Sequence, residues 1–420
     1  MYSPLIHDNC KRPAAATYNS GSMSAIYPFR ALRPAPKAAA AVASVPYDVV
    51  NTEEARALAE GNPLSFLRVS RPEIELPAGA DAHGAAVYDL AAKNFARLKE
   101  QAPLVEEEAA SCYVYRLHMG SHVQSGVAAC FSIDEYDRGL IKKHEKTRPD
   151  KEDDRTRHML AIGAQTGPVF LTHRSSPAVD EAVSRAVLDD PLYDIVAPDG
   201  VRHQVWRVPA TVTAQIVAAF AALDSLYIAD GHHRAASAAR TRRSLAGKGA
   251  GEHDRVLAVA FPDNQVQVLP YNRVVRDLYG LTAGEFLASL KRRLTVTDGG
   301  PATPARKGQV AVYLAGAWHT LTLPAGAAAL DVDILESTIL EPVLGIHDVR
   351  TDKRIDFVGG IRGTSALEQL VDSKAFAVAF SMFPVSVEDL MRVSDAGEIM
   401  PPKSTWFEPK LRDGLLSHLL

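Results

Sequence analysis

Hydrophobic and polar residues alternate along two neighbouring stretches, Ser111–Met119 and Gln124–Ser132, which a short Gly-Ser connection separates. A period of two is typical of strands that bury one face, and two such strands with a short turn between them predict a hairpin. The near-continuous apolar run Val256–Phe261 predicts a buried strand. Between residues 82 and 101 the apolar positions recur at helical spacing instead, which predicts an amphipathic helix.

Strands and helices alternate irregularly along the rest of the chain. Ser65–Val69 is a further strand candidate, and Thr52 followed by Glu53 and Glu54 predicts the start of a helix with Thr52 as its N-cap. Hairpins mixed with irregularly placed helices predict an α+β fold with mixed sheets rather than a doubly wound α/β fold.

No clear linker divides the 420 residues, a length that suits two domains or one large domain. Residues 1–22 are polar, rich in Ala and Ser and without a period, so we predict a disordered extension there. A weak break near residues 209–222 separates an N-terminal α+β region, 23–210, from a C-terminal α+β region, 211–420. The two regions are also compatible with one integrated domain.

Within residues 226–239 the sequence changes from apolar to polar residues over a few positions. The strand-forming run Leu-Tyr-Ile-Ala leads into Asp-Gly-His-His-Arg, and an Ala-rich segment with high helix propensity follows. We therefore predict a strand, a tight turn and a helix whose first turn carries the two histidines and Arg234. Free backbone N–H groups and the positive end of the helix dipole meet at such a turn, so it is a candidate phosphate site. A solvated turn with a helix cap is the alternative.

Residues 141–160 form the most charged block of the chain. A solvated helix with ion pairs four residues apart would explain many of these charges. Pro149 interrupts the block, however, and many side chains that bind anions lie within a short span. These are His144, Lys146, Arg148, Arg155, Arg157 and His158.

Composition excludes several classes of function. The net charge is −4 and the basic residues are spread out, which does not favour nucleic-acid or membrane-surface binding. No run of 18 uncharged apolar residues predicts a transmembrane helix. The three cysteines lack the spacing of a metal site or a disulfide framework, so the expected location is the reducing cytoplasm.

Common catalytic signatures are absent from the sequence. It has no phosphate-binding loop of the G-x-x-x-x-G-K-[ST] type, no G-x-G-x-x-G, no G-x-S-x-G and no H-E-x-x-H. The remaining chemistry consists of cations and carboxylates in segments that Pro and Gly restrict. Phosphoryl transfer needs such groups to hold phosphates, to hold Mg²⁺ and to accept a proton.

Five motifs in order along the chain carry a family resemblance: Pro-Phe-Arg at 28–30, Pro-Tyr-Asp-Val at 46–49, His-Glu-Lys-Thr at 144–147, Asp-Gly-His-His-Arg at 230–234, and Met-Pro-Pro-Lys-Ser-Thr-Trp-Phe-Glu-Pro-Lys-Leu at 400–411. This set resembles the domain-of-unknown-function 1015 family over about residues 23–416. The family name implies little about function.

The motif at 230–234 is also similar to that of free-serine kinases with the ParB/sulfiredoxin fold. That resemblance implies a ParB/sulfiredoxin-like nucleotide-binding core, ATP or ADP as the phosphate donor, Mg²⁺, and L-serine as the substrate. Gly231, His232, His233 and Arg234 would then bind phosphates, and Asp230 would act near Mg²⁺ or the transferred group. No position matches the catalytic glutamate of those kinases, and Glu145 is our substitute on chemical grounds.

The candidate site residues fall into four groups. The catalytic candidates are Asp230, His232, His233 and Glu145. The candidates for binding nucleotide phosphates are Gly231, His233, Arg234, His144, Lys146, Thr147 and Arg148. The candidates for binding the substrate are Arg30, Tyr47, Asp48, Lys403, Ser404 and Thr405, and Asp230 is the candidate Mg²⁺ ligand. We expect the segments 144–148 and 403–410 to fold against Gly231.

Three functions remain open at this point. The first is a nucleotide-dependent phosphotransferase that acts on a small hydroxyl compound. The second is a non-catalytic nucleotide-binding regulator of the ParB-like type. The third is a phosphate-ester hydrolase with His232 or His233 as general base. The expected partner is a small molecule rather than nucleic acid or a membrane. The oligomeric state stays open, with a homodimer as one option.

Overall fold

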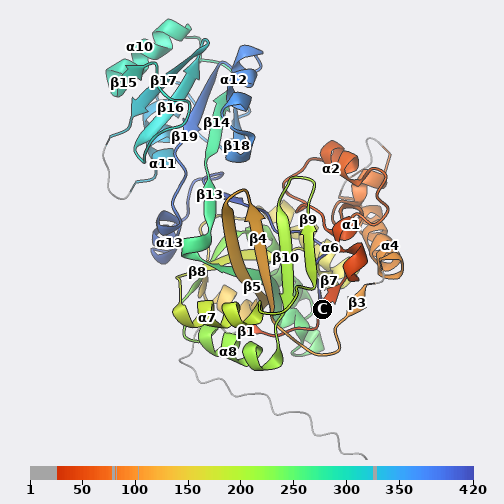
Figure 1. Ribbon diagram of the computed structural model, residues 1–420. Helices are drawn as coiled ribbons and strands as arrows, with labels where there is room; N and C mark the ends of the chain where they lie inside the picture. The colour runs from red at the N-terminus through yellow and green to blue at the C-terminus, as the bar shows by residue number, and fades with distance from the viewer. Residues whose placement is uncertain (1–25, 78–80, 82, 103, 325–328) are drawn as a thin grey trace, which may run out of the picture.

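The computed structural model describes residues 26–77, 81, 83–102, 104–324 and 329–420. The extension predicted at residues 1–22 lies outside these ranges. Within them the chain forms a mixed α+β structure with two large sheets, which confirms the predicted class (Figure 1). No helix among the described residues has the length and apolar character that a membrane crossing requires.

A nine-stranded mixed sheet forms the lower part of the molecule in Figure 1. Its pairs are antiparallel except β11 with β6 and β12 with β8. The strands in spatial order are β6 (Ile141–Lys142), β11 (Leu226–Asp230), β8 (Val169–His173), β12 (Arg255–Pro262), β5 (His122–Ser132), β4 (Tyr113–Met119), β10 (Arg202–Arg207) and β9 (Tyr193–Val196), with β1 (Ile26–Tyr27) also paired to β5.

A six-stranded sheet forms the upper part. In spatial order its strands are β15 (Thr295–Asp298), β17 (Ala317–Thr322), β16 (Gln309–Leu314), β19 (Val378–Met382), β14 (Tyr271–Val275) and β18 (Ile355–Gly359). Three short pairs complete the strands: β13 (Gln267–Leu269) with β20 (Trp406–Glu408), β2 (Leu32–Arg33) with β3 (Val105–Glu106), and β7 (Ala164–Gln165) with β21 (His418–Leu419).

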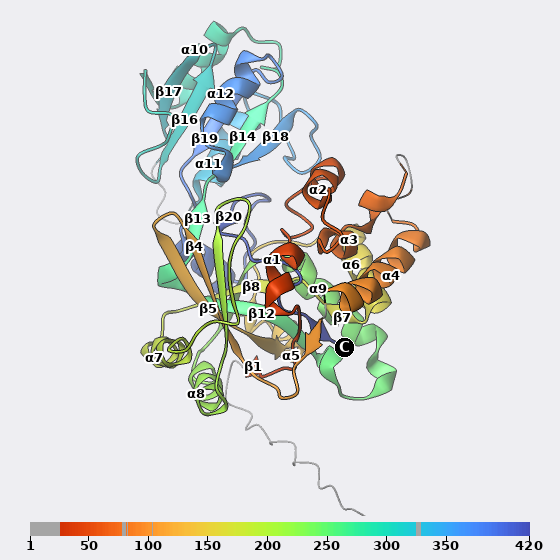
Figure 2. The same ribbon diagram turned by 45° about the vertical axis from the view of Figure 1, so that its right-hand side comes forward.

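The α-helices surround both sheets. α7 and α8 pack against each other beside β5 and β1, whereas α6 packs between α4 and α9 (Figure 2). Their bounds are α1 (Ala39–Val42), α2 (Thr52–Ala59), α3 (Leu67–Ser70), α4 (Ala85–Gln101), α5 (Ile133–Asp137), α6 (Pro149–Ile162), α7 (Pro177–Ala186), α8 (Ala210–Phe220), α9 (His232–Ser244), α10 (Ala283–Arg293), α11 (Asp331–Leu335), α12 (Ser365–Asp372) and α13 (Val387–Asp395).

The large sheet is buried on both faces, and β5 shows how the sequence achieves this. Val127, Ala129 and Phe131 lie in one apolar cluster, while Ala128 and Cys130 lie in the other. Successive side chains of a strand point to opposite faces, so an uninterrupted apolar run supplies both cores. The predicted hairpin of β4 and β5 and the predicted strand β12 are confirmed.

Three local predictions need correction. Ser65–Val69 is not a strand, because α3 begins at Leu67. The N-cap of α2 is Asn51 rather than Thr52, since the Asn51 side chain accepts from the N–H of Glu54 at 2.9 Å. Pro149 does not interrupt a helix but begins α6, where its missing N–H has no partner to lose.

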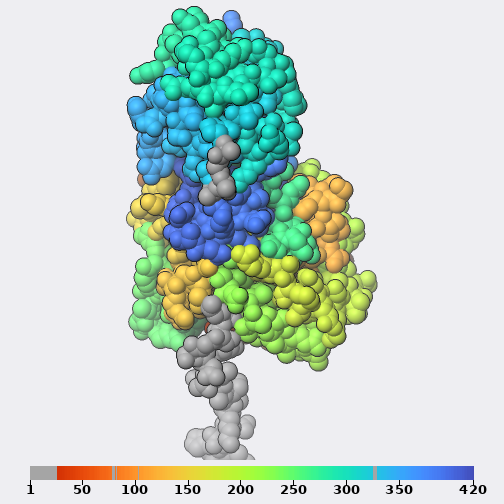
Figure 3. Space-filling model, turned by 90° about the vertical axis from the view of Figure 1, so that its left-hand side faces the viewer, coloured from red at the N-terminus to blue at the C-terminus, as the bar shows by residue number. Residues whose placement is uncertain are grey.

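The predicted boundary between residues 210 and 211 runs through the nine-stranded sheet. β11 and β12 follow it in the chain, yet they pair with β8 and β5, which precede it. The six-stranded sheet lies wholly within residues 271–382. Its chain then returns to the large sheet through α13, where Asp395 pairs with Lys142 of β6 at 2.6 Å. Figure 3 shows this dark-blue return segment between the two sheets.

Candidate functional site

The turn at Gly231 joins β11 to α9, as the sequence predicts. Gly231 has a φ of 91°, a left-handed conformation that favours glycine. A Cβ atom at this position would lie 3.0 Å from Cζ of Arg234, so the turn also needs glycine for space. Within the part of the chain that the structure describes, no side chain caps the first turn of α9. Its leading N–H groups are therefore left without a side-chain acceptor, as they are at helix ends that can bind anions.

Asp230 lies at the centre of a small charge network. Its Oδ1 accepts the N–H of Gly231 at 2.9 Å, and its Oδ2 lies 3.1 Å from Nζ of Lys410 and 3.6 Å from Nη2 of Arg234. Burial disfavours the charged carboxylate, but Lys410 and Arg234 outweigh burial and hold the pKa of Asp230 well below its usual range. Asp230 is therefore an anion whose two oxygens are both engaged.

Arg234 lies beneath the turn rather than at its mouth. The side chain is 5% exposed, and Nη1 donates to the carbonyl of Pro168, which immediately precedes β8. Its guanidinium thus joins the turn to the neighbouring strand and adds a positive charge below the N-terminus of α9.

The two histidines of the motif accept backbone N–H groups from the segment before α6. His232, which is 4% exposed, accepts from His144 at 3.4 Å through Nε2. His233 accepts from Arg148 at 3.1 Å, also through Nε2. Burial lowers the pKa of both rings, so each is neutral and carries its proton on Nδ1. The expected contact between 144–148 and the turn is confirmed.

His144 and Glu145 lie directly against this pair of histidines. The rings of His144 and His232 meet edge to face at 4.5 Å, and burial lowers the pKa of His144 to about 4. Glu145 places Oε2 at 3.8 Å from Nδ1 of His232, which is the nitrogen that carries the proton. Burial raises the pKa of Glu145, and Lys403 opposes that effect.

The C-terminal segment 400–410 contacts His144 and Asp230, as expected. The N–H of Met400 donates to the carbonyl of His144 at 2.8 Å, and Thr405 Oγ1 lies 3.3 Å from Nε2 of His144. Lys410 supplies the cation beside Asp230. Segments more than 80 and more than 160 residues away from the motif in the sequence thus meet at one turn.

Among the residues that the structure describes, Glu145 and the exposed Asp48 form no ion pair with a lysine or arginine at this turn. The charge of Asp48 acts on Glu145, His233, Arg234 and Lys403, which places it at the same turn. Lys403 is itself exposed and has its Nζ 5.5 Å from the centre of the Tyr271 ring. The turn therefore combines helix N–H groups, exposed Lys403 and two available carboxylates.

The family follows from the sequence match. The model of DUF1015, a protein family of unknown function, matches residues 26–341, well over half of the chain. The chain belongs to the DUF1015 family. The matched residues include the segment 144–148 and the turn at Gly231, whereas the tail with Lys410 lies beyond them. No curated protein gives a significant match.

Solved structures give this DUF1015 chain distant likenesses. A conserved hypothetical protein from Pyrococcus furiosus is 17% identical with a TM-score of 0.36, covering 70% of this chain and 95% of that chain. A free serine kinase in complex with AMP is 16% identical with a TM-score of 0.36, covering 69% and 92%. SbnI with a C-terminal truncation, from Staphylococcus aureus, is 13% identical with a TM-score of 0.38, covering 68% and 85%.

The other predicted site residues of the DUF1015 chain have other partners. Arg30 pairs with Glu106 at 2.9 Å and donates to the carbonyl of Glu107, with no described contact to the turn. Ser404 donates to the carbonyl of Pro401 at 2.7 Å, a contact within the tail. Thr147 donates a hydrogen bond to Glu152, and the Arg148 guanidinium pairs with Asp150. The guanidinium of Arg155 lies over the Tyr47 ring, and Lys146 is exposed.

Sequence reasoning missed a buried carboxyl group beneath the site. Asp413 is 3% exposed, and burial raises its pKa to about 7 although Arg234 opposes that effect. Arg155 and Asp48 also act on it, which places it on the inner side of the turn. No motif marks Asp413, because it belongs to an unremarkable Leu-Arg-Asp-Gly stretch. Only its burial against Gly167 and Ser44 singles it out.

Proposed function

We propose that this protein transfers a phosphoryl group from ATP or ADP to the hydroxyl group of L-serine, giving O-phosphoserine. The observation that supports this most is the convergence at one turn of the uncapped end of α9, the cation Lys403 and the carboxylates Glu145 and Asp48. Phosphoryl transfer depends chiefly on holding phosphates and on accepting the proton of the nucleophile.

The phosphates of the nucleotide would bind at the N-terminus of α9. His233 supports this assignment, because its Nε2 accepts the N–H of Arg148 and its Nδ1–H is left to donate. Lys146 is exposed in the same segment and can pair with a phosphate. Arg234 would act from below as a buried positive charge rather than as a direct ligand.

Glu145 would be the general base. It would take the proton of the serine hydroxyl while that oxygen forms a bond to the terminal phosphorus of the nucleotide, and the bond from phosphorus to the bridging oxygen would break. Burial raises the pKa of Glu145 toward neutrality, which suits a base that works near pH 7. Asp48 and Lys403 carry the two charges that a serine zwitterion needs, for its ammonium and its carboxylate.

Mg²⁺ fits Asp230 poorly, because Lys410 and the N–H of Gly231 already engage its oxygens. Glu145 is assigned as the base and Asp48 to the serine ammonium, so the substrate phosphates would supply most of the ligands of the ion. When bound, the ion would neutralise charge on the transferred group. The described residues contain no cluster of three or more His, Cys, Asp or Glu side chains that could hold a metal ion.

We also propose that β11, β8 and α9 belong to a ParB/sulfiredoxin-like nucleotide-binding core, on the strength of the Gly-His-His-Arg turn at the start of α9. We assign the reaction to the cytoplasm, because Cys112 and Cys130 are free thiols, as a reducing compartment maintains them. The hydrolase alternative gains no support from His232, whose Nε2 accepts a backbone N–H and whose Nδ1 faces Glu145.

Phosphorus NMR of the purified chain with Mg²⁺, L-serine and either ATP or ADP tests the proposal. We expect O-phosphoserine from the wild type and a loss of about 100-fold or more in Glu145→Gln, with circular dichroism confirming its fold. Glu181→Gln, an exposed change on α7, is the matched control. Nucleotide binding by calorimetry without product from either donor would instead indicate the regulator. Phosphate release from O-phosphoserine without nucleotide would indicate the hydrolase.

A further inference from the structure

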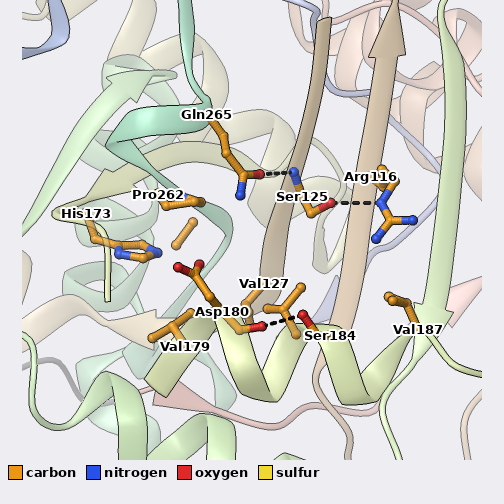
Figure 4. Close-up of a pocket in the computed structure, with 12 residues that line it drawn as sticks. Arg116, Ser125, Val127, His173, Val179, Asp180, Ser184, Val187, Pro262 and Gln265 are labelled. Atoms are coloured by element: carbon orange, nitrogen blue, oxygen red, sulfur yellow. Dashed lines mark hydrogen bonds between the residues drawn. The ribbon is translucent and has the colours of Figure 1, made fainter. Parts of the chain in front are cut away.

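A cavity of about 230 Å³ lies away from the Gly231 turn, between the strands β4, β5 and β12 and the helix α7 (Figure 4). Its walls combine valine side chains with a few polar groups. The residues that matter for its chemistry are Arg116, His173, Asp180 and Gln265, and Val127 and Val183 contribute to its apolar surface. The cavity has room for several water-sized groups.

Opposite charges line this cavity without pairing. Arg116 donates through Nε to Ser125 Oγ at 2.8 Å and lies over the Trp206 ring at 4.9 Å. Neither Arg116 nor Asp180 has a salt-bridge partner among the described residues. A half-buried guanidinium and a half-buried carboxylate without ion-pair partners are both available to charged groups of a ligand.

His173 adds a hydrogen-bond acceptor beside Asp180. Its side chain is fully buried, and Nδ1 lies 2.8 Å from the carbonyl of Arg174, so Nδ1 must donate. In the neutral ring this leaves Nε2 as an acceptor, and Nε2 is buried without a partner among the described residues. Figure 4 shows this ring pointing toward the carboxylate of Asp180. Nε2 of His173 and the carboxylate of Asp180 can therefore both accept hydrogen bonds from an N–H group of a ligand.

Gln265 and Arg116 supply hydrogen-bond donors to the same cavity. Gln265 accepts the N–H of Ser125 through Oε1 at 2.8 Å, so its NH₂ group is left to donate. The guanidinium of Arg116 lies on the same side of the cavity as Ser125 (Figure 4). An arginine fork with a neighbouring amide donor is typical of a carboxylate site.

We propose that this cavity binds an aliphatic amino acid as a zwitterion. The ammonium group lies between Asp180 and Nε2 of His173, the carboxylate faces Arg116, and the apolar side chain packs on the valines. This site is separate from the proposed phosphotransfer site. Arg234 contacts the residue before β8, whereas His173 is its last residue, and five strand residues span roughly 17 Å.

Calorimetry on the full chain with L-valine tests the assignment. L-valine has no hydroxyl group, so it cannot be an acceptor in the proposed reaction, and the variants at Arg116 and Asp180 separate its binding in this cavity from binding at the turn. Isobutylamine is L-valine without the carboxylate, and 3-methylbutanoate is L-valine without the ammonium group. We expect L-valine to bind and each analogue to bind at least about 10-fold more weakly, because each loses a charge-assisted contact.

Arg116→Gln and Asp180→Asn should each weaken L-valine binding by about 10-fold or more. Arg185→Gln and Glu181→Gln are matched controls on α7 that do not line the cavity, and both should bind as the wild type does. Circular dichroism verifies the fold of each variant, and His173→Gln offers a second test of the ammonium end. The proposal is overturned if the folded wild type binds neither L-valine nor the longer 5-aminovalerate at millimolar concentrations. Equal binding of L-valine and either analogue would also overturn it.

Discussion

Replacing Gly231 by alanine should destabilise the protein through two separable effects. The left-handed backbone at φ 91° costs an L-residue about 1–2 kcal/mol. The new Cβ would also lie 3.0 Å from Cζ and Nε of Arg234, which is closer than ordinary contact. Arg234 cannot retreat freely, because it donates to Pro168 and lies beside Asp230. Loss of such a charge-assisted hydrogen bond costs about 1.5–3 kcal/mol, so we expect a total of roughly 3–5 kcal/mol.

Gly200→Ala provides the matched control for this prediction. Gly200 has a φ of 79°, but a Cβ there would meet no atom within 4 Å. That variant should therefore show the backbone cost alone, about 1–2 kcal/mol. Urea denaturation followed by circular dichroism measures both variants against the wild type. If Gly231→Ala and Gly200→Ala unfold at the same urea concentration, the reasoning about Arg234 is wrong.

Three further predictions concern the charges around the turn. Glu145→Gln should leave ATP binding within about 3-fold of the wild type by calorimetry while product formation is lost, because a general base acts mainly in the transition state. Lys410→Met should lower the free energy of unfolding by about 2 kcal/mol at pH 7 in urea denaturation, since Asp230 loses its nearest cation. Asp413 has a folded-state pKa of about 7, above its unfolded value of 3.8, so its titration reduces stability as pH rises between those values. The stability of Asp413→Asn relative to the wild type should therefore increase from pH 4 to pH 7, and a constant difference would contradict the assignment.

Local patterns predicted the turn at Gly231 well. A strand-forming run, an Asp-Gly pair and an Ala-rich segment are each short-range signals, and β11 and α9 follow them closely. The convergence of 144–148 and the tail was also predicted, because charged groups in Pro-containing segments have little other reason to be held in place. The hydrogen bonds were not predicted, since His232 and His233 accept backbone N–H groups from His144 and Arg148.

Predictions that depended on distant partners were harder. Arg30 had the same appearance in sequence as the other basic residues, but Glu106 pairs with it. Ser65–Val69 contains three apolar residues, which a short helix and a short strand share, and periodicity cannot separate the two over five residues. The large sheet pairs strands from both sides of residue 210, and no local composition reports such pairing.

The pairing of Asp230 with Lys410 affects the order in which parts of the protein can fold during synthesis. All strands of both large sheets precede residue 383, so a chain synthesised that far contains every strand that these sheets need. It still lacks Lys403, Thr405 and Lys410, and Asp230 is then an anion next to Arg234 alone. A ribosome adds residues at about 5–20 per second, so the two sheets can form seconds before the turn receives its last cation. Completion of the candidate site therefore follows the synthesis of every strand of both large sheets.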